Sequence, residues 1–542
     1  MVSRIGGSSP NVPTTRPADS GPTNRTPSST AIGSIFEAGK SVFESIGKSL
    51  DRLGLTTPTP PPTLSRNDRQ RAPLPEVQGL QEGLNTWSAA NGRPAIKADG
   101  LFGPKTESSV KEFQRANGLP PTGVAGPGVQ VRLEIENNAD FQRLNDDTKR
   151  ALRTQLTAAG DDFAKLHNLE RLATSPGLSN LSPAHQQQMV AALASQPTDT
   201  QLSVALTRLA DSPEFAAASD ATKTSLIDTL RTNGPATFDK VNGALALIGS
   251  SEFRNLSDAD KALAMEGLRG AGADPRYAAS LQTLIADPKF QALSADAKTA
   301  VLSQAKNYPD ARATDNFRLA LSKDWFGTQS LADQQRSLKL IGRLSTYDSG
   351  DRTIIDNTLN RFLSPSSDYK LVWKEYSDPA GSVTYGSARD GTLWLNRSIV
   401  ADGNARMVEN DTTNHLALST TPHEVNHNIN GDEVTNTFHY FEAEYRAWYV
   451  GFQAEHGRPP TSAEALDQRI EWQFNTVNQY GRTAAEAMKD PTEAAKFYDF
   501  LSRLSGKPVD ASNWRSVIAE DPTTWSTATA NAPVPSGNLT NQ

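Results

Sequence analysis

The stretch "SPEFAAASDATKTSL", residues 212–226, decides the main architecture because its pattern recurs along the middle of the chain. An apolar anchor, Phe215, is followed four residues later by Ser219, a residue type that can cap the N-terminus of a helix. A Leu- and Ala-rich helix, a short loop and a second helix then lead to the next anchor. The anchors follow one another at intervals of 36 to 38 residues, and they are Phe141, Leu178, Phe215, Phe253, Phe290 and Phe326. The residues at the cap position are Asn145, Ser182, Ser219, Ser257, Ser294 and Ser330.

This two-helix unit, repeated six times, predicts a stacked helical array over residues 137–345. Such an array can present a concave surface that grips a substrate or host protein, or it can act as a scaffold between other domains. The units share no recurring exposed aromatic or charged stripe, which would mark a common binding face. We therefore favour the scaffold interpretation.

The composition excludes several classes of function. The chain has 542 residues, too many for a single hydrophobic core, and a net charge of −7 that is spread without blocks of one sign. No basic patch is present, which argues against nucleic acid as a partner. No apolar run approaches the roughly 20 residues that a transmembrane helix needs. The chain contains no cysteine, so any zinc site has to use His, Asp or Glu.

Both ends of the chain are predicted to be disordered. Residues 1–72 are rich in Ser, Thr and Pro, and residues 521–542 resemble them, so neither segment buries enough apolar surface to offset its ordering entropy. Residues 32–54 interrupt the leader with apolar residues on one helical face. This amphipathic helix predicts docking on a secretion chaperone, on a membrane surface or on the protein's own domains. The first residues lack a continuous apolar segment, so a Sec-type signal is not predicted.

Residues 73–135 show a pattern of helices separated by Gly-rich turns. This segment resembles the three-helix peptidoglycan-binding-like module, at Leu80, Gln81, Asp99, Gly100, Phe102, Gly103, Thr106, Val110, Phe113, Gln114, Gly118, Leu119 and Gly123. The resemblance implies binding to cell-wall glycan or peptide. The matched positions are mostly core and turn residues, so they identify the fold better than the ligand.

The composition changes after residue 345. The segments "YKLVWKEYS", "GSVTYGSA" and "GTLWLNRSI" alternate apolar and polar residues between Gly and Asp turns, which predicts a small antiparallel sheet. Helical patterns resume from Pro422 to about Asp510. Residues 346–520 are therefore predicted to form an α+β domain. A fragment from about Gly342 to Pro522 is expected to fold by itself.

This α+β domain contains the pattern HEVNH at residues 423–427. Two histidines four apart on a helix, His423 and His427, direct both imidazoles to one point, which suits two corners of a tetrahedral zinc site. Glu424 is offset around the helix, so its carboxylate can accept a proton from an activated water molecule and pass it to a leaving amine. The pattern also fits a capping box without catalytic meaning, with Thr421 as the N-cap and Glu424 reaching back.

A catalytic zinc site needs a third protein ligand, and the segment "HYFEAEYRAWYVG" offers Glu442 and Glu444. The Glu-Tyr-Arg-Ala run that begins at Glu444 resembles the second-helix pattern of gluzincins and the Glu-Tyr-Arg stretch of bacterial effector-type HExxH peptidases. This resemblance implies Glu444 as the third ligand of one Zn²⁺ per chain, with Glu442 as the alternative. A metzincin pattern would need Gly at 430 and His or Asp at 433, where this chain has Asn430 and Glu433.

Three further polar residues, His439, Tyr445 and Tyr449, are candidates for stabilising a tetrahedral oxyanion. Each is also a plausible packing residue. Strands followed by a helix that carries HExxH are the order expected of a zincin-type peptidase domain.

Together these features predict a multidomain, mainly α protein. Its parts are a three-helix peptidoglycan-binding-like module, an α-helical repeat array and an α+β zincin-like catalytic domain. The predicted function is a zinc metallopeptidase, a hydrolase secreted by a Sec-independent machine into a host cell, where it acts as a virulence effector on a protein or peptide substrate. The alternatives are a peptidoglycan-directed hydrolase that cuts murein peptides and a non-enzymatic repeat scaffold or adhesin.

Overall fold

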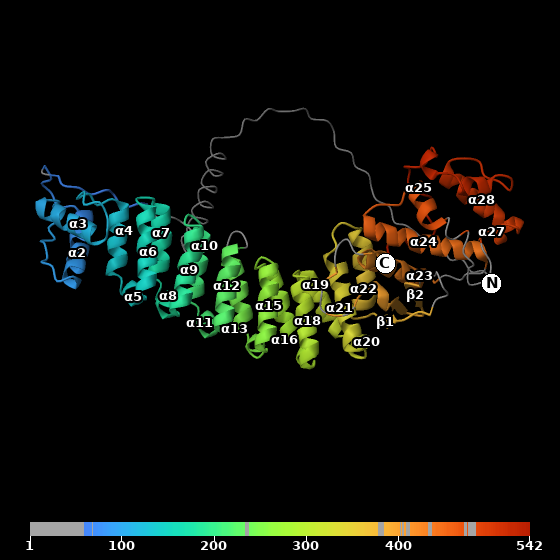
Figure 1. Ribbon diagram of the computed structural model, residues 1–542, viewed down its shortest axis with the longest axis horizontal. Coiled ribbons are helices and arrows are strands. Elements are labelled where there is room, and N and C mark those ends of the chain that lie inside the picture. Colours follow the sequence, from blue (N-terminus) through green and yellow to red (C-terminus); the bar gives the residue numbers. More distant parts are fainter. Residues whose placement is uncertain are drawn as a thin grey trace, which may run out of the picture. The chain divides into compact units, whose positions relative to one another are not determined.

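The computed structural model describes residues 59–541, apart from residues 68, 233–237, 378–383, 402, 404–405, 408–411, 432–435, 471–473 and 475–483. The predicted leader up to residue 58, with its amphipathic helix at 32–54, lies outside the described residues. The described chain is mainly helical and contains one small sheet (Figure 1). Within the described ranges, every helix is too short or too polar to span a lipid bilayer.

The first domain of the described chain consists of α2 (Pro75–Ala90), α3 (Pro104–Ala116) and α4 (Pro127–Asn137). Each helix begins with proline, whose missing N–H has no intrahelical partner to lose at this position. The three helices share a core made of Val77, Leu80, Leu84, Trp87, Phe102, Val110, Phe113, Ala125, Val129 and Leu133.

The segment before α2 contributes to this domain. Leu64 is buried in the same core, and its backbone forms two hydrogen bonds with Ala125, of 2.9 and 2.8 Å. The prediction of disorder is therefore wrong around Leu64. One apolar side chain and one backbone bridge attach a segment whose overall composition is that of a disordered chain.

The turn between α2 and α3 is held by a buried polar side chain. The amide of Gln81 accepts a hydrogen bond from the Gly100 N–H at 2.8 Å and donates to the Leu101 carbonyl at 3.0 Å and to Thr106 Oγ1 at 2.9 Å. Gly100 has a φ of 71°, a left-handed conformation that favours glycine. These contacts explain why turn positions dominate the resemblance noted for this segment.

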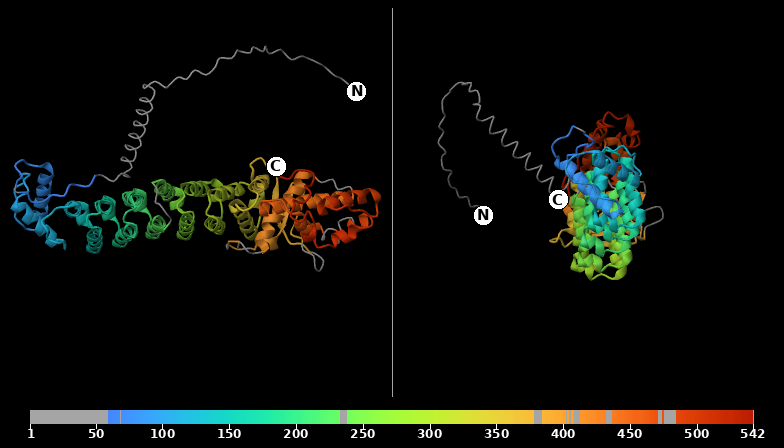
Figure 2. Two further views of the ribbon diagram at one scale, coloured as in Figure 1. Left: turned by 90° about the horizontal axis from the view of Figure 1, so that it is seen from above. Right: turned by 90° about the vertical axis from the view of Figure 1, so that its left-hand side faces the viewer.

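The helical array follows, and each unit contains one short helix and two longer ones (Figures 1 and 2). The short helices are α5 (Ala139–Arg143), α8 (Pro176–Asn180), α11 (Pro213–Ala217), α14 (Ser251–Arg254), α17 (Pro288–Gln291) and α20 (Asp324–Gly327). The first long helices are α6 (Asp146–Ala159), α9 (Pro183–Ser195), α12 (Asp220–Thr232), α15 (Asp258–Gly270), α18 (Ala295–Asn307) and α21 (Leu331–Thr346). The second long helices are α7 (Phe163–Ala173), α10 (Thr200–Ala210), α13 (Phe238–Gly249), α16 (Pro275–Ala286), α19 (Ala311–Leu321) and α22 (Arg352–Leu363). Each long helix packs against its counterpart in the next unit, which produces two layers of helices.

The predicted anchors and caps are confirmed in every unit. The six anchors lie in the short helices and are at most 2% exposed. The side chain at each cap position accepts a hydrogen bond from a backbone N–H in the first turn of the long helix that follows. The array extends further than predicted, because α22 is the second long helix of the sixth unit and ends at Leu363. The composition change after residue 345, which suggested a domain boundary, falls at the end of α21 and in the loop to α22, inside that unit.

The sheet contains β1 (Lys370–Lys374), β2 (Gly386–Arg389) and β3 (Thr392–Asn396), in the order β1-β3-β2. β2 and β3 form the predicted antiparallel hairpin, closed by Asp390 and Gly391 with φ values of 48° and 69°. The prediction is wrong for β1, which pairs with β3 in parallel. β1 and β2 lie on opposite sides of β3, and the alternation of residues along a strand does not reveal such an order.

Two long helices, α23 (Thr412–Asn430) and α24 (Thr437–His456), pack against each other and follow the sheet. The sequence predicted a helix start at Pro422, but α23 continues through this proline. Ala417 and Leu418, one turn earlier, are fully buried, and their packing extends the helix beyond the position that local preferences favour. Thr421 Oγ1 donates to the Ala417 carbonyl, so Thr421 is not an N-cap.

The last part of the described chain covers α24 with α25 (Ser462–Ala465), a one-turn π-helix (Leu466–Ile470), α27 (Ala484–Ala487), α28 (Pro491–Ser505) and α29 (Trp514–Ile518). The predicted disordered tail continues this unit instead. Trp525 and Ala532 are buried in its core, and Asn541 is fully buried. The prediction failed because a few apolar side chains and many backbone hydrogen bonds to distant helices order this polar segment.

The array and the sheet share one hydrophobic core. Polar contacts join the same elements: Trp373 Nε1 of β1 donates to Ser337 Oγ of α21 at 2.8 Å, and Arg397 forms two hydrogen bonds with Asp333 of α21, at 3.0 and 2.9 Å. A fragment that starts at Gly342 would expose this core. The shared core therefore argues against the expectation that such a fragment folds by itself.

Candidate metal centre

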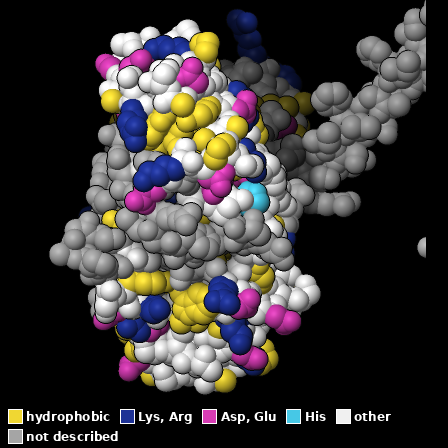
Figure 3. Space-filling view, turned by 90° about the vertical axis from the view of Figure 1, so that its right-hand side faces the viewer, with side chains coloured by type: hydrophobic (Ala, Val, Ile, Leu, Met, Phe, Trp, Pro, Cys, Tyr) yellow, Lys and Arg dark blue, Asp and Glu magenta, His cyan; other side chains and the backbone are white. Residues whose placement is uncertain are grey.

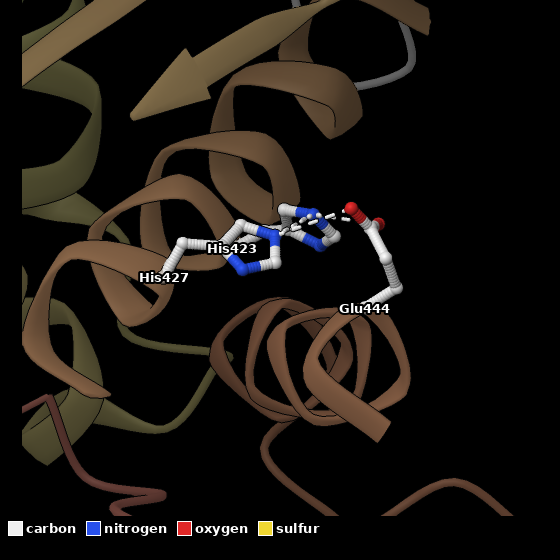
Figure 4. Close-up of side chains that lie close together, drawn as sticks. All are labelled: His423, His427 and Glu444. Atoms are coloured by element: carbon white, nitrogen blue, oxygen red, sulfur yellow. Dashed lines mark hydrogen bonds and ion pairs between the residues drawn. The ribbon is translucent and has the colours of Figure 1, made fainter. Parts of the chain in front are cut away.

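The candidate metal centre lies between α23 and α24, which pack closely against each other. A Cβ at Gly451 of α24 would lie 2.5 Å from the Ser419 carbonyl oxygen of α23, so only glycine permits this separation. At this contact His423 and His427 project from α23 toward Glu444 of α24 (Figure 4). Within the described part of the chain, no other three histidine or acidic side chains come together in this way.

The distances among the three side chains suit a single metal ion. The two Nε2 atoms of His423 and His427 are 3.2 Å apart. The carboxylate oxygens of Glu444 lie 3.7 Å from His423 Nε2 and 3.6 Å from His427 Nε2. In a tetrahedral zinc site, with bonds of about 2.0–2.2 Å, neighbouring donor atoms are separated by about 3.3–3.6 Å. Two imidazoles and one carboxylate are also a donor set that zinc takes in catalytic sites.

The electrostatic environment keeps these side chains in the form that binds a metal. Burial and the neighbouring His427 hold the pKa of His423 well below its usual value, so its imidazole stays neutral. Burial alone would raise the pKa of Glu444, but the Arg469 guanidinium, the neighbouring His427 and a hydrogen bond from Tyr440 hold it at about 2. Glu444 is therefore ionised at neutral pH.

Arg469 and Tyr440 were not predicted from the sequence. The Arg469 guanidinium donates to Glu444 Oε2 from the π-helical turn at Leu466–Ile470. Burial and the charge of Glu444 raise the pKa of Tyr440, so its hydroxyl stays protonated as a donor. Tyr440 lies one turn before Glu444 on the same helix, a spacing that could have suggested the contact. No local signal identifies Arg469, which reaches the site through tertiary packing.

Glu424 lies beside these three side chains and close to β2. Its Oε1 is 4.0 Å from His423 Nε2, and its side chain is 11% exposed. β2 passes so close that a Cβ at Gly386 would lie 2.7 Å from Glu424 Cγ. Burial raises the pKa of Glu424 to about 7, which places this carboxylate near the operating pH of a general base.

The other predicted site residues take different positions. Glu442 is not part of the group of three side chains. Tyr445 and Tyr449 pack in the aromatic core behind α24, and Tyr445 Oη donates to the Pro533 carbonyl at 3.0 Å. Since each residue turns about 100° around a helix, Tyr445 points away from the side that Glu444 occupies. His439 lies in the first turn of α24.

The structure describes one of the two positions that a metzincin pattern would use. Asn430 accepts a hydrogen bond from the Asn538 N–H, and Glu433 lies outside the described residues.

The face shown in Figure 3 mixes acidic, basic and hydrophobic side chains over its described part, and charges of one sign do not dominate that part.

Comparison with known protein families identifies the first domain of the described chain. Residues 74–133 match the family described as "Putative peptidoglycan binding domain". This part of the chain carries a peptidoglycan-binding domain. The match coincides with α2 to α4 and does not extend to the histidines of α23.

A curated relative is an "Uncharacterized protein in bpoA1 3'region" from Kitasatospora aureofaciens, 38% identical over 80 residues. The matched segment covers 15% of this chain and 62% of the relative's length. No solved structure matches the chain.

Proposed function

We propose that this protein is a zinc-dependent endopeptidase that cleaves a protein target. The observation that carries the proposal is the convergence of His423, His427 and Glu444, with the buried carboxylate of Glu424 beside them. A capping role does not explain this arrangement, because α23 begins at Thr412, eleven residues before His423, and Glu424 lies in its interior. An inert scaffold does not explain why an ionised glutamate and two histidines share one small space.

His423, His427 and Glu444 would hold the zinc ion, which supplies Lewis-acid activation of a water molecule when bound. Glu424 accepts the proton of the attacking water and passes it to the leaving amine nitrogen. Its pKa of about 7 allows both steps near neutral pH. The ligand side chains are 16–19% exposed, so a substrate can reach them from solvent.

The sheet favours an extended polypeptide as substrate. β2 is an edge strand in the order β1-β3-β2 and passes directly over Glu424. An extended chain can add to such an edge through main-chain hydrogen bonds, which depend little on its sequence. Unstructured segments of a target protein are therefore the substrates that this site suits best.

The route of delivery in this proposal is a Sec-independent secretion machine, with a host cell as the destination. The support is the Ser/Thr/Pro-rich composition of residues 1–72, interrupted by the amphipathic segment at 32–54. A secretion chaperone would bind the amphipathic segment at 32–54. The peptidoglycan-binding domain would then act on the wall that the protein has to pass, or on cell-wall fragments at its destination.

A second candidate is a peptidoglycan-directed hydrolase that cuts murein peptides. The family match of residues 74–133 favours it, because such a domain would hold the wall near the zinc site. We rank it lower because the matched residues identify a fold and not a ligand, and because the edge strand suits a long extended chain better than a short peptide stem.

Two measurements test the proposal. The purified protein should contain one zinc ion per chain, and the double variant His423→Ala/His427→Ala should contain none. Glu424→Gln should retain zinc and lose turnover, with Glu442→Gln as the matched control that retains both. Cleavage is followed by comparing peptides released from cell lysates and from purified sacculi by the wild type and by Glu424→Gln. Absence of zinc in the wild type would reject the proposal, and cleavage of sacculi alone would establish the second candidate.

Arg469 provides a separate test of the site. Arg469→Met removes the cation that holds Glu444, and we expect the affinity for zinc to fall by about 10- to 100-fold, as is typical when a hydrogen-bond partner of a ligand is lost. Arg458→Met is the matched control, because Arg458 pairs with Glu464 away from the ligands. Equal zinc affinity in the wild type and Arg469→Met would show that Arg469 does not support the site.

A further inference from the structure

Residues Pro533–Asn541, which we call the C-terminal strap, run beside the two helices that carry the candidate ligands. Tyr445 Oη donates to the first carbonyl of the strap at 3.0 Å, and Arg446 Nη1 donates to the Ser536 carbonyl at 3.2 Å. Tyr445 and Arg446 directly follow Glu444 on α24. The strap is therefore attached to the turn of α24 that supplies the third ligand.

The strap is also attached to α23, within the HEVNH motif. Asn426 precedes the second histidine, and its Nδ2 donates to the Asn538 carbonyl at 2.7 Å and to Asn541 Oδ1 at 2.8 Å. Asn541 Nδ2 donates at 3.0 Å to the carbonyl of Pro422, which precedes the first histidine. Asn426 and Asn541 are fully buried, so a substitution that removes one partner leaves the other partner buried without its hydrogen bond.

A buried contact connects the two helices at the same place. Arg446 Nε donates to Asn426 Oδ1 at 3.2 Å, so Asn426 contacts both α24 and the strap. Asn430, one turn later on α23, accepts from the Asn538 N–H at 2.8 Å. Gly537 has a φ of 95°, and a Cβ there would lie 2.7 Å from Asn430 Oδ1. Glycine is therefore required for the strap to approach α23.

We infer that the C-terminal strap is a positioning element for the metal centre. It fixes α23 relative to α24, and it thereby sets the distances between Glu444 and the two histidines. A shift of α23 would move both imidazoles together and leave Glu444 behind on α24. Donor atoms that lie 3.2 to 3.7 Å apart leave little room for such a shift. The inference rests on the proposed function in one respect, namely that a zinc ion binds at these side chains.

The test measures zinc affinity in the full-length protein by competition with a chelating dye. Asn541→Ala and Gly537→Ala should each weaken zinc binding by about 10- to 100-fold, the range found when partners of ligands are lost. Deletion of residues 536–542 should weaken it at least as much. A synthetic peptide of residues 533–542, added to the truncated protein, should restore the affinity. Val534→Ser is the matched control, because Val534 is 62% exposed in the same segment, and its affinity should stay within twofold of the wild type.

Circular dichroism at the assay temperature separates positioning from a general loss of folding. If the truncated protein is unfolded, the two point variants decide the matter. Folded Asn541→Ala and Gly537→Ala proteins that bind zinc as tightly as the wild type would overturn the inference. If the strap served only thermal stability, the folded truncated protein would bind zinc as tightly as the wild type. The peptide would then have no loss of affinity to restore. A wild type without zinc would reject the proposed function and the inference together, whereas unchanged variants of a zinc-binding wild type reject the strap alone.

Discussion

Replacing Gly386 by alanine tests whether the position of Glu424 controls turnover. A Cβ at this residue would lie 2.7 Å from Glu424 Cγ, whereas ordinary contacts of this kind begin at 3.4 Å. The glutamate side chain or β2 therefore has to move by about 0.7 Å (3.4 − 2.7). A displacement of this order at a reacting group reduces the rate by up to about 100-fold. We expect kcat to fall by about 10- to 100-fold, which corresponds to about 1.4–2.8 kcal/mol of transition-state stabilisation.

The assay is steady-state cleavage of an unstructured protein substrate, combined with zinc analysis of the same preparations. The three atoms nearest to the added Cβ all belong to Glu424, so Gly386→Ala should keep one zinc ion per chain. Gly327→Ala is the control, because a Cβ there meets nothing within 4 Å. A zinc-loaded Gly386→Ala protein with kcat within twofold of the wild type would refute the reasoning. A loss of zinc in this variant would mean that β2 supports the ligands and not only the base.

Three further predictions concern the third ligand, an exposed ion pair and the array. Glu444→Ala should lose tight zinc binding and Glu442→Ala should keep it; metal analysis showing the reverse would make Glu442 the ligand. The hydrogen bond from Arg458 holds the pKa of Glu464 at about 2, below its usual 4.5, so the stabilisation is present above pH 4.5 and is lost as the pH falls toward 2. Glu464→Gln should lower the free energy of unfolding by about 1 kcal/mol at pH 7, allowing for solvent screening of this exposed pair, and urea melts should show a smaller difference at pH 3. Deleting residues 215–251, one whole period, should preserve helical circular dichroism per residue, whereas deleting half a period should not; equal losses would contradict the repeat.

The features that the sequence predicted correctly depend on residues close together in the chain. An anchor and its cap lie four residues apart, and the helix they begin is stabilised within its own unit. Phe215 and Ser219 therefore carry most of the information needed to place a unit. The two histidines four apart on a helix are equally local, which is why His423 and His427 were paired from the sequence.

The features that the sequence did not predict depend on contacts between distant residues. Arg469 reaches Glu444 from a π-helical turn that its own sequence does not mark. Asn541 is held by hydrogen bonds to partners more than 100 positions earlier in the chain. The residues next to it in the sequence are polar, and they alone suggested disorder. β1 pairs in parallel with β3, on the side opposite β2, and the pattern of alternation within each strand is the same in either case. Local composition contains no signal for these long-range partners.

The core shared by the last repeat and the sheet determines how the chain would yield to mechanical force. Tension applied from the N-terminal side should extract the array one unit at a time, since each unit contacts mainly its neighbours. The C-terminal region should resist as a single block, because Asn541 is hydrogen-bonded to Thr358 and to Pro422, which lie far apart along the chain. Asp333, through its pair with Arg397, adds the last repeat to that block. We expect force–extension traces with a series of small steps followed by one large rupture. A translocase that threads this protein from its N-terminal side would therefore meet the greatest resistance when it reaches the C-terminal region.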